Sequence, residues 1–451
     1  MTQPPKPAAR PDRVSLWRYA KLFRQDILSA QPARLYRAWM AEFRTPFFRS
    51  YLVNQPDLVA EILKARPMDF PKSDRIGAGL RPLLGESVFV TNGATWQRQR
   101  RIIDPAFEGG RLRETFPAMQ AAAEAMAARL TDQAGTTVEI EEAASHVAAD
   151  VIFRTLFSLP IEDALATKVF HEFRAYQRTQ PILNLAAFVK GPRWMPRLFR
   201  RDTKRAARRI RALITQLTER RAAEIAAGTA PDDLATKIMT TRDPETGETF
   251  TPAEMVDQVA IFFLAGHETS ASALGWALYL MALYPDWQDK LAAEARSTLT
   301  GGSFAEVAQL RLSRDVFRET LRLYPPVPMM VREATCPERF RDRDIAVGAQ
   351  MVLSPWHLHR HTRIWDRPDD FDPARWQTDA GRHCAREAYM PFSAGARVCP
   401  GAGFAMIEGV LLLSTVLRDL RVAPVAGKTP VPEAHLTVRA RDGIWLHVTR
   451  R

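Results

Sequence analysis

The chain has 451 residues and a formal net charge of +12 at pH 7. With 46% hydrophobic and 25% charged residues, its composition is that of a globular protein and excludes a low-complexity chain. Three cysteines are too few for a disulfide framework and fit a reducing compartment, so we expect a cytoplasmic protein. The positive charge leaves nucleic acid, an anionic membrane surface and an acidic protein open as partners.

The N-terminal residues 1–13 are polar and rich in proline, and we expect them to be a flexible segment of one domain that spans residues 1–451. This start lacks the apolar core and cleavage site of a secretory signal. No early stretch is apolar enough to span a bilayer. Further on, an apolar run from Phe47 to Val53 predicts a strand, and residues 56–64 predict a helix.

A glycine- and leucine-rich stretch runs from Ile76 to Val90, and a helix begins near Trp96. Trp96 and Arg100 are four residues apart and share one face of that helix. An indole N–H and a cation on one face can both bind a carboxylate. The spacing alone is a weak signal, because it also occurs by chance.

From Leu112 to about Leu217 the pattern is mostly helical, with breaks at Pro181 and Pro192. Residues 190–211 hold ten lysines and arginines opposed by one acid, Asp202. No nucleic-acid-binding module surrounds this run, so we expect no nucleic acid partner. Peripheral membrane contact through residues 190–211 and an ordinary solvated helix face both remain open.

A long helix begins at Thr251, where Pro252 and Glu254 complete a capping box, and should end near Tyr284 before a proline. It is apolar almost all round, which predicts a buried helix.

The polar residues His267, Glu268 and Thr269 interrupt this helix near its middle and argue against a membrane span. The preceding Gly266 would let a ligand approach closely, and the Thr269 hydroxyl could bond a carbonyl one turn back. A satisfied polar cluster inside a buried helix is the other interpretation.

Two further groups of polar residues follow along the chain, an acid–arginine pair and a set of three histidines. Glu319 and Arg322 form an i,i+3 pair before an apolar stretch from Val327 to Arg332. Three histidines then alternate at positions 357, 359 and 361, but no cysteine or carboxylate completes a zinc set, so we expect no metal there.

Residues 392–401, here called the cysteine loop, place Cys399 between glycines, with Arg397 two residues before it. Glycines let backbone N–H groups turn toward the sulfur, which favours the thiolate that binds metal. Arg397 could reach an acidic group of the same ligand, and Phe392 could cover the sulfur. A helix should follow from Ala402 to about Leu417, and Asp442-Gly443 predicts a hairpin near the C-terminus. An inert, buried free cysteine is the alternative for Cys399.

The pattern Phe-x-x-Gly-x-Arg-x-Cys-x-Gly in the cysteine loop resembles the signature of the cytochrome P450 family. The Trp-x-x-x-Arg element, the stretch Ala265 to Thr269 and the Glu319-x-x-Arg322 pair resemble further family motifs in the family's order. The resemblance covers about Leu83 to the C-terminus. It implies the family's fold, mainly α with small β-sheets, and haem b held by an axial cysteine thiolate.

Residue roles follow from this resemblance. Thr269 and Glu268 would be catalytic and handle protons, and Cys399 would be the iron ligand. Glu319, Arg322 and Arg375 would form a structural ionic network. Cofactor contacts would come from Trp96, Arg100, Ala265, Arg332, Phe392, Arg397, Cys399 and Gly401. The stretch from Ile76 to Val90 would form the loop that roofs the substrate pocket. Substrate contacts would come from Phe89, Ala265, Val327 and Met329, under a lid between Phe173 and Phe199.

The implied reaction inserts one atom of O₂ into a largely apolar organic substrate. Electrons would come from separate partners, a ferredoxin and a ferredoxin reductase, docking near Arg397 and Cys399 on a monomer, because the chain has no dinucleotide fingerprint. A peroxide-using enzyme, a rearranging haem enzyme and a haem sensor or carrier remain as alternatives. The Glu268-Thr269 pair argues against the first, and no output module supports the last.

Overall fold

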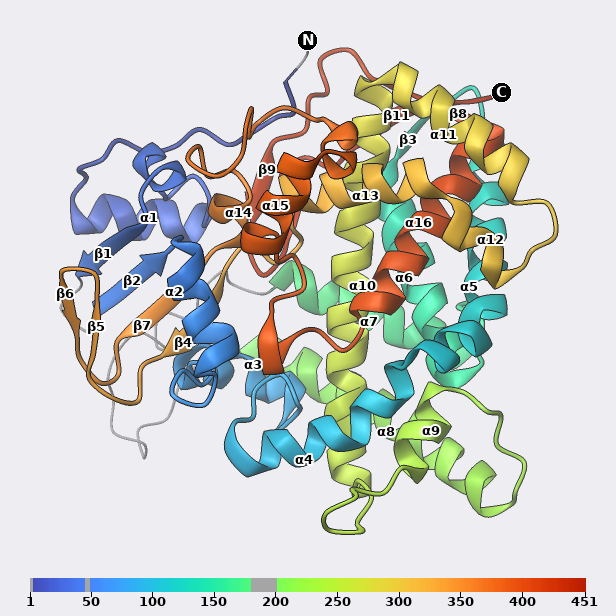
Figure 1. Cartoon of the computed structure of the whole chain (residues 1–451). Helices are drawn as coiled ribbons and strands as arrows, with labels where there is room; N and C mark the ends of the chain where they lie inside the picture. The colour runs from blue at the N-terminus through green and yellow to red at the C-terminus, as the bar shows by residue number, and fades with distance from the viewer. Residues whose placement is uncertain (1–2, 45–48, 180–200) are drawn as a thin grey trace.

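The computed structural model describes residues 3–44, 49–179 and 201–451. Most of these residues are helical, and the largest sheet lies to one side of the helical body (Figure 1). The fold is therefore mainly α with small β-sheets, which confirms the expectation from sequence. The helices are α1 (Leu16–Gln25), α2 (Pro56–Ala60), α3 (Asp74–Leu84), α4 (Gly93–Ile103), α5 (Gly109–Asp132), α6 (Ile140–Phe157), α7 (Ala164–Thr179), α8 (Arg201–Ala226), α9 (Leu234–Thr240), α10 (Pro252–Leu283), α11 (Pro285–Thr298), α12 (Phe304–Gln309), α13 (Arg311–Leu323), α14 (Pro355–Leu358), α15 (Asp379–Ala388) and α16 (Ala402–Asp419).

Four strands form the largest sheet in the order β1-β2-β7-β4, in which β2 and β7 are parallel and the outer pairs are antiparallel (Figure 1). The described residues also form a three-stranded sheet, β3-β11-β8, and the pairs β9-β10 and β5-β6. The strands are β1 (Met40–Arg44), β2 (Arg49–Val53), β3 (Thr137–Glu139), β4 (Met330–Glu333), β5 (Glu338–Phe340), β6 (Arg343–Ile345), β7 (Gln350–Leu353), β8 (Leu420–Pro424), β9 (Pro432–Ala434), β10 (Val438–Ala440) and β11 (Trp445–Arg450).

Helix α10 runs through the centre of the molecule and organises the core (Figure 1). Its start is as predicted, because the Thr251 side chain accepts from the Glu254 N–H and the Glu254 carboxylate accepts from the Thr251 N–H. It ends at Leu283, and Pro285 begins α11. The helix packs against α6, α8, α13 and α16, which explains why it is apolar almost all round. Among the described residues, no helix is long and apolar enough to cross a bilayer.

Two local predictions are wrong. Residues 76–90 do not form a loop throughout, because α3 occupies Asp74–Leu84; Gly77 is buried there, where a Cβ would lie 3.7 Å from Val90. The turn at Asp442-Gly443 does not close a hairpin, since β10 pairs with β9 while β11 pairs with β3 and β8. In both cases packing against distant residues decides the structure.

The segment before α1 contacts the body of the protein. The Tyr324 hydroxyl donates to the Pro5 carbonyl at 2.8 Å, and Lys6 pairs with Asp369 at 2.9 Å. The flexibility expected of residues 1–13 stays a prediction. Most of the expected lid between Phe173 and Phe199, and residues 190–200 of the basic run, lie outside the described residues.

Candidate active site

The cysteine loop is a tight turn held by its own backbone. The N–H of Cys399 donates to the Phe392 carbonyl at 2.9 Å, and the N–H of Val398 donates to the Gly395 carbonyl at 3.0 Å. Gly395 has a φ of +66°, and a Cβ there would collide with the carbonyl oxygen of Leu63, so only glycine fits. The loop therefore fixes Cys399 just before α16.

The thiol of Cys399 lies in a mixed environment. The residue is exposed, yet enough protein surrounds the thiol that burial raises its pKa, while a hydrogen bond from the Gly401 backbone and the charge of Arg100 act in the opposite direction. A coordinated metal ion overcomes the effect of burial, because a ligating thiol loses its proton outright.

One face of α10 is open at the middle of this buried helix. Ala265 is exposed and Thr269, one turn later, is half-buried, whereas most of their neighbours in the helix are buried. The Thr269 hydroxyl donates to the Ala265 carbonyl at 2.6 Å, as the sequence predicts. Ser270 donates to Glu408 of α16 at 2.6 Å, so this stretch of α10 lies beside the helix that follows Cys399.

Gly266 and His267 face α6. A Cβ on Gly266 would lie 2.5 Å from the Ile152 side chain, so the glycine serves helix packing and the expectation that it makes room for a ligand is wrong. His267 is buried 2.7 Å from the Ser145 hydroxyl, and burial lowers the pKa of His267 to about 3. His267 is therefore neutral and structural.

Glu268 points toward the β9-β10 pair. Its Oε1 accepts from the Thr437 hydroxyl at 2.8 Å and lies 2.8 Å from a guanidinium nitrogen of Arg439. The Glu268 side chain is buried, whereas that of Arg439 is 40% exposed. An acid in the middle of α10 is thus connected to the protein surface.

Two buried arginines, Arg332 and Arg397, and the half-buried Lys72 gather near Trp96. The guanidinium of Arg397 lies 4.2 Å from the Trp96 ring centre, and the Lys72 ammonium lies 5.9 Å from it. Lys72 forms a β-bridge with Arg332 of β4. Within the described residues, Nε of Arg332 and both Nε and Nη1 of Arg397 are buried without a hydrogen-bond partner. Buried guanidinium N–H groups that lack a hydrogen-bond partner fit a ligand that carries carboxylates.

The pKa shifts in this cluster have the same cause. Burial, followed by repulsion from Arg397, Arg332 and Arg100, lowers the pKa of Lys72 to about 6. Burial and neighbouring arginines likewise lower the pKa of Arg332 and of Arg397 to about 10. A bound carboxylate would relieve this repulsion, because an opposite charge favours the protonated forms.

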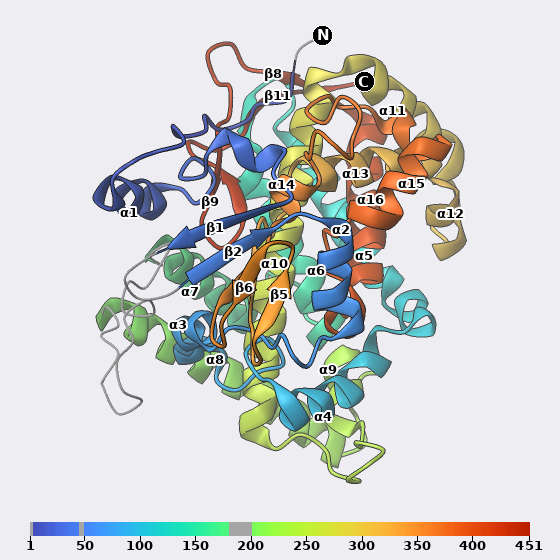
Figure 2. The ribbon, with the colours of Figure 1, turned by 60° about the vertical axis from the view of Figure 1, so that its left-hand side comes forward.

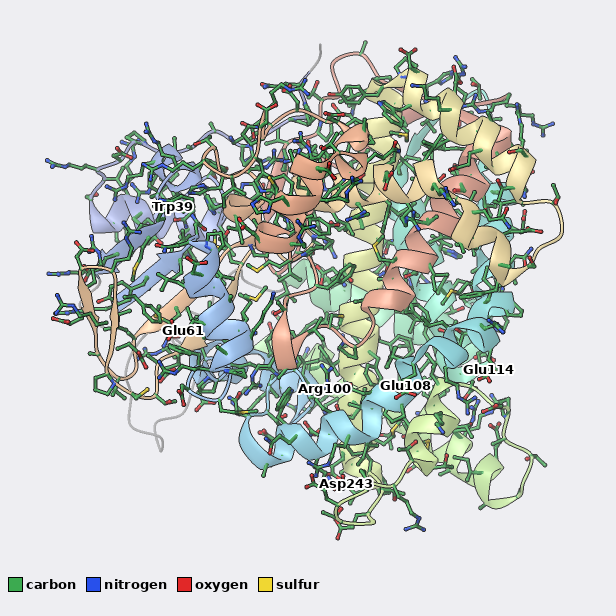
Figure 3. All side chains as sticks on the ribbon, in the orientation of Figure 1. Trp39, Glu61, Arg100, Glu108, Glu114 and Asp243 are labelled. Atoms are coloured by element: carbon green, nitrogen blue, oxygen red, sulfur yellow. The ribbon has the colours of Figure 1, made fainter. Side chains whose placement is uncertain are left out.

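Arg100 joins α4 to the cysteine loop (Figure 3). Its Nη1 donates to the Val398 carbonyl at 2.7 Å, and its Nε lies 2.8 Å from Asp104. Trp96 and Arg100 therefore both reach the cysteine loop, as their shared helix face suggested. Arg100 already has an acidic partner, unlike Arg332 and Arg397.

A buried ionic network lies between α13 and the segment before α15. Glu319 and Arg322 are fully buried with their charged atoms 2.8 Å apart, and Arg375 lies 3.3 Å from Glu319. Arg322 also donates to the carbonyls of His359 and Asp370. These three residues come together as the sequence suggested, and they hold chain segments in place without reaching the open face of α10.

The apolar residues expected to contact substrate occupy different environments. Phe89 is 45% exposed between α3 and α4, while Val327 and Met329 are half-buried before β4. Ala265 is exposed on α10, and Phe392 is half-buried in the cysteine loop. The three alternating histidines are buried around α14, and no metal-binding cluster occurs among the described residues.

The cytochrome P450 family model matches residues 40–446. The chain belongs to the cytochrome P450 family. Cyclooctat-9-en-7-ol 5-monooxygenase of Streptomyces melanosporofaciens is 31% identical over 92% of this chain and 88% of its own length. Cytochrome P450 4A10 of Mus musculus is 28% identical over 89% of this chain and 82% of its own length. The heme domain of a cytochrome P450DA mutant matches the whole chain and 98% of its own with a TM-score of 0.81 at 23% identity, which shows the shared fold.

This cytochrome P450 is a haem-thiolate monooxygenase that inserts one oxygen atom from O₂ into an organic substrate, with electrons from redox partners. Its cofactor is haem b with a cysteine thiolate on the iron. The residues present fit this group. The cysteine loop offers a thiol, the open face of α10 lies beside the following helix, and the unpaired donors of Arg332 and Arg397 match propionate carboxylates.

Sequence reasoning missed three residues near this site. Lys72 lies outside any motif, and only its pairing with β4 brings it to the arginines. Thr437 and Arg439 reach Glu268 from almost 170 residues further along the chain, so no local pattern signals them. A carboxylate in the middle of a buried helix needs a polar partner, but the sequence does not show which residue this partner is.

Proposed function

We propose that Cys399 is the axial ligand and that Lys72, Trp96, Arg332 and Arg397 hold the haem propionates. The observation that carries this proposal is the group of buried, unpaired arginine donors beside the cysteine loop. Arg100 would support the loop through Val398 and reach the cofactor's edge. Phe392 and Gly401 would flank the sulfur. Thiolate-ligated haem supplies the oxidising power, because the thiolate pushes electron density that favours O–O cleavage.

The protein's own part in the reaction is to position substrate and to move protons. The Thr269 hydroxyl lies on the open face of α10 beside Ala265 and would give protons to oxygen bound there. Glu268 would resupply them from the surface, since its carboxylate contacts the half-exposed Arg439. Replacing Thr269 by alanine should divert consumed O₂ into hydrogen peroxide, whereas Thr269→Ser should retain coupling. Equal coupling in both variants would contradict this role.

We infer that Phe89, Ala265, Val327 and Met329 line the substrate site. All four side chains are apolar and none is fully buried, which supports an apolar substrate. Cyclooctat-9-en-7-ol, the compound in the name of the Streptomyces relative, is the first substrate to test. A product heavier by one oxygen atom, derived from ¹⁸O₂, would support the proposal. A spectral change on binding without any oxygenated product would instead favour a carrier of this compound.

The electron donor is proposed to be a ferredoxin with its reductase. The support is the net charge of +12 and the exposed cations Lys64 and Arg113 near the cysteine loop, where Gly395 abuts Lys64 and Gly403 abuts Leu112. Charge reversal of Lys64 and Arg113 should slow electron transfer from an acidic ferredoxin at low salt. The matched control is reversal of the exposed Arg311 and Arg314. Unchanged rates would contradict the proposal.

We also propose where the enzyme is located, its oligomeric state and a contact with membranes. A location in the cytoplasm is supported by the three free cysteines, and a single domain by the one family match over residues 40–446. We expect this domain to be a monomer. Contact of residues 190–211 with a membrane surface is supported by their basic sequence and by exposed Lys204, Arg205 and Arg208 in α8. Sedimentation of the holoenzyme at several concentrations tests the monomer, and any dimer would contradict it.

A further inference from the structure

A second basic segment, besides residues 190–211, lies near the N-terminus. Residues 10–49 contain nine lysines and arginines but only three acids. One of the acids, Asp26, is buried and accepts from backbone N–H groups of Leu28, Ser29 and Ala434. It therefore does little to offset the cations at the surface.

Helix α1 exposes a tryptophan among these cations. Trp17 is 83% exposed, more than any other large hydrophobic side chain in the described parts of the chain. Lys21 and Arg24 follow one and two turns later on the same face, and all three are exposed. The opposite face is occupied, since Tyr19 lies 5.6 Å from Phe23 between ring centres. Packing inside the protein therefore does not explain why a tryptophan stands at position 17.

The charged surface continues onto the β1-β2 pair. Tyr19 of α1 stacks on Phe43 of β1 with ring centres 6.5 Å apart, so the two elements are joined. Arg44 and Arg49 stand directly opposite each other in the strand register, a like-charge pair that is unfavourable without an anion. Arg44 pairs with Glu42, and the other arginine beside Glu42 is Arg343.

A groove adjoins these arginines. It has a volume of about 440 Å³ and is lined by Arg34, Glu42, Arg44 and Arg343 together with small apolar residues. Its cations outnumber its one carboxylate, so it suits a phosphate group. We call the exposed side chains of Trp17, Arg18, Lys21, Arg24, Arg34, Arg44 and Arg49 the N-terminal basic surface.

We propose that the N-terminal basic surface binds an anionic lipid bilayer, with Trp17 at the level of the headgroups and the cations against lipid phosphates. Tryptophan favours the membrane–water interface because its ring is apolar and its N–H is polar. Each cation near an anionic leaflet strengthens binding roughly fivefold. Helix α16, which follows the cysteine loop, lies on the other side of the molecule from α1 in both views (Figure 1 and Figure 2), so docking leaves it free. None of the seven side chains of the N-terminal basic surface belongs to residues 190–211.

The test is cosedimentation of the full-length holoenzyme with vesicles of phosphatidylglycerol and phosphatidylcholine, or of phosphatidylcholine alone. We expect binding to the anionic vesicles only, weakening with salt. The variant Arg18→Glu/Lys21→Glu/Arg24→Glu should bind at least tenfold more weakly, and Trp17→Ser severalfold more weakly. Matched controls are Arg311→Glu/Arg314→Glu/Arg386→Glu and the exposed apolar Val347→Ser, which should bind as the wild type does. The carbon monoxide spectrum verifies that each variant is folded.

Several results would overturn the proposal. One is wild-type protein that does not bind anionic vesicles; another is an α1 variant that binds them as well as the controls do. Loss of binding only in Arg205→Glu/Arg208→Glu would assign membrane contact to α8. If the α1 variant retained vesicle binding but accepted electrons from a ferredoxin more slowly, the surface would be a protein-docking site.

Discussion

The carboxylate of Glu268 lies 2.8 Å from the guanidinium of Arg439, which joins the middle of α10 to β10. The same oxygen accepts from the Thr437 hydroxyl, while the Thr269 hydroxyl is bonded to its own helix. Glu268 therefore does not contact Thr269 in this arrangement. Its carboxylate must leave Arg439, or act through water, to pass a proton to Thr269.

Replacing Glu268 by glutamine tests this proton path. The amide keeps the shape and the bond from Thr437 but cannot carry a proton, so product formation should fall about 100-fold. The solvent isotope effect on turnover should rise, because proton delivery becomes slower. The control is Glu142→Gln, an exposed acid on α6. Turnover within twofold of the wild type, with haem retained, would exclude Glu268 from the path.

Lys72→Met tests the cation cluster without relying on activity. The pKa of Lys72 is lowered to about 6, so between pH 6 and about 10.5 the unfolded chain binds more protons there than the folded chain. The cost of burying Lys72 is thus full below pH 6 and disappears as pH rises. In haem-free protein, Lys72→Met should raise the melting temperature most at pH 6 and least at pH 10.

The same substitution should weaken haem binding, because one partner of the propionates is lost. Transfer of haem to an excess of apomyoglobin measures this directly. Lys64→Met, at an exposed lysine, should change neither property. A variant that holds haem as tightly as the wild type does would remove Lys72 from the cofactor site.

Glu319→Gln should strongly destabilise the protein. Glu319 is the carboxylate partner of two buried guanidinium groups, those of Arg322 and Arg375. Removing its charge leaves both uncompensated, which costs about 3–5 kcal/mol. Urea unfolding followed by helical circular dichroism measures the loss. Asp379→Asn breaks an exposed pair with the same i,i+3 spacing and should have little effect; equal effects of both changes would contradict the network's role.

Glu408 should make the folded protein less stable as the pH rises. It is fully buried on α16 with Ser270 as its partner, and burial raises the pKa of Glu408 to about 8. The folded protein therefore holds a proton that the unfolded chain releases above about pH 4.5, and stability falls as pH rises from about 4.5 to about 8. The melting temperature of Glu408→Gln should exceed that of the wild type by more at pH 9 than at pH 6. A constant difference between these pH values would mean that the carboxyl is already ionised.

The sequence predicted those parts of the site that depend on local spacing. Thr251 and Glu254 set the start of α10, and Thr269 bonds one turn back to Ala265, because helix geometry alone fixes both contacts. The Glu319–Arg322 pair is equally local. Lys72 and Arg439 were missed, since their positions depend on strand pairing and on packing between distant segments. Gly266 was misread for the same reason: only the position of Ile152 on α6 explains it.

The carbon monoxide difference spectrum of the reduced protein tests most directly whether Cys399 holds the haem iron. The wild type should give the strongly red-shifted Soret band of thiolate-ligated haem, and Cys399→Ser should lose that band. Cys384→Ser, which changes a cysteine outside the site, should keep it. An unshifted, imidazole-like band in both the wild type and Cys399→Ser would contradict ligation by Cys399 and place a histidine on the iron.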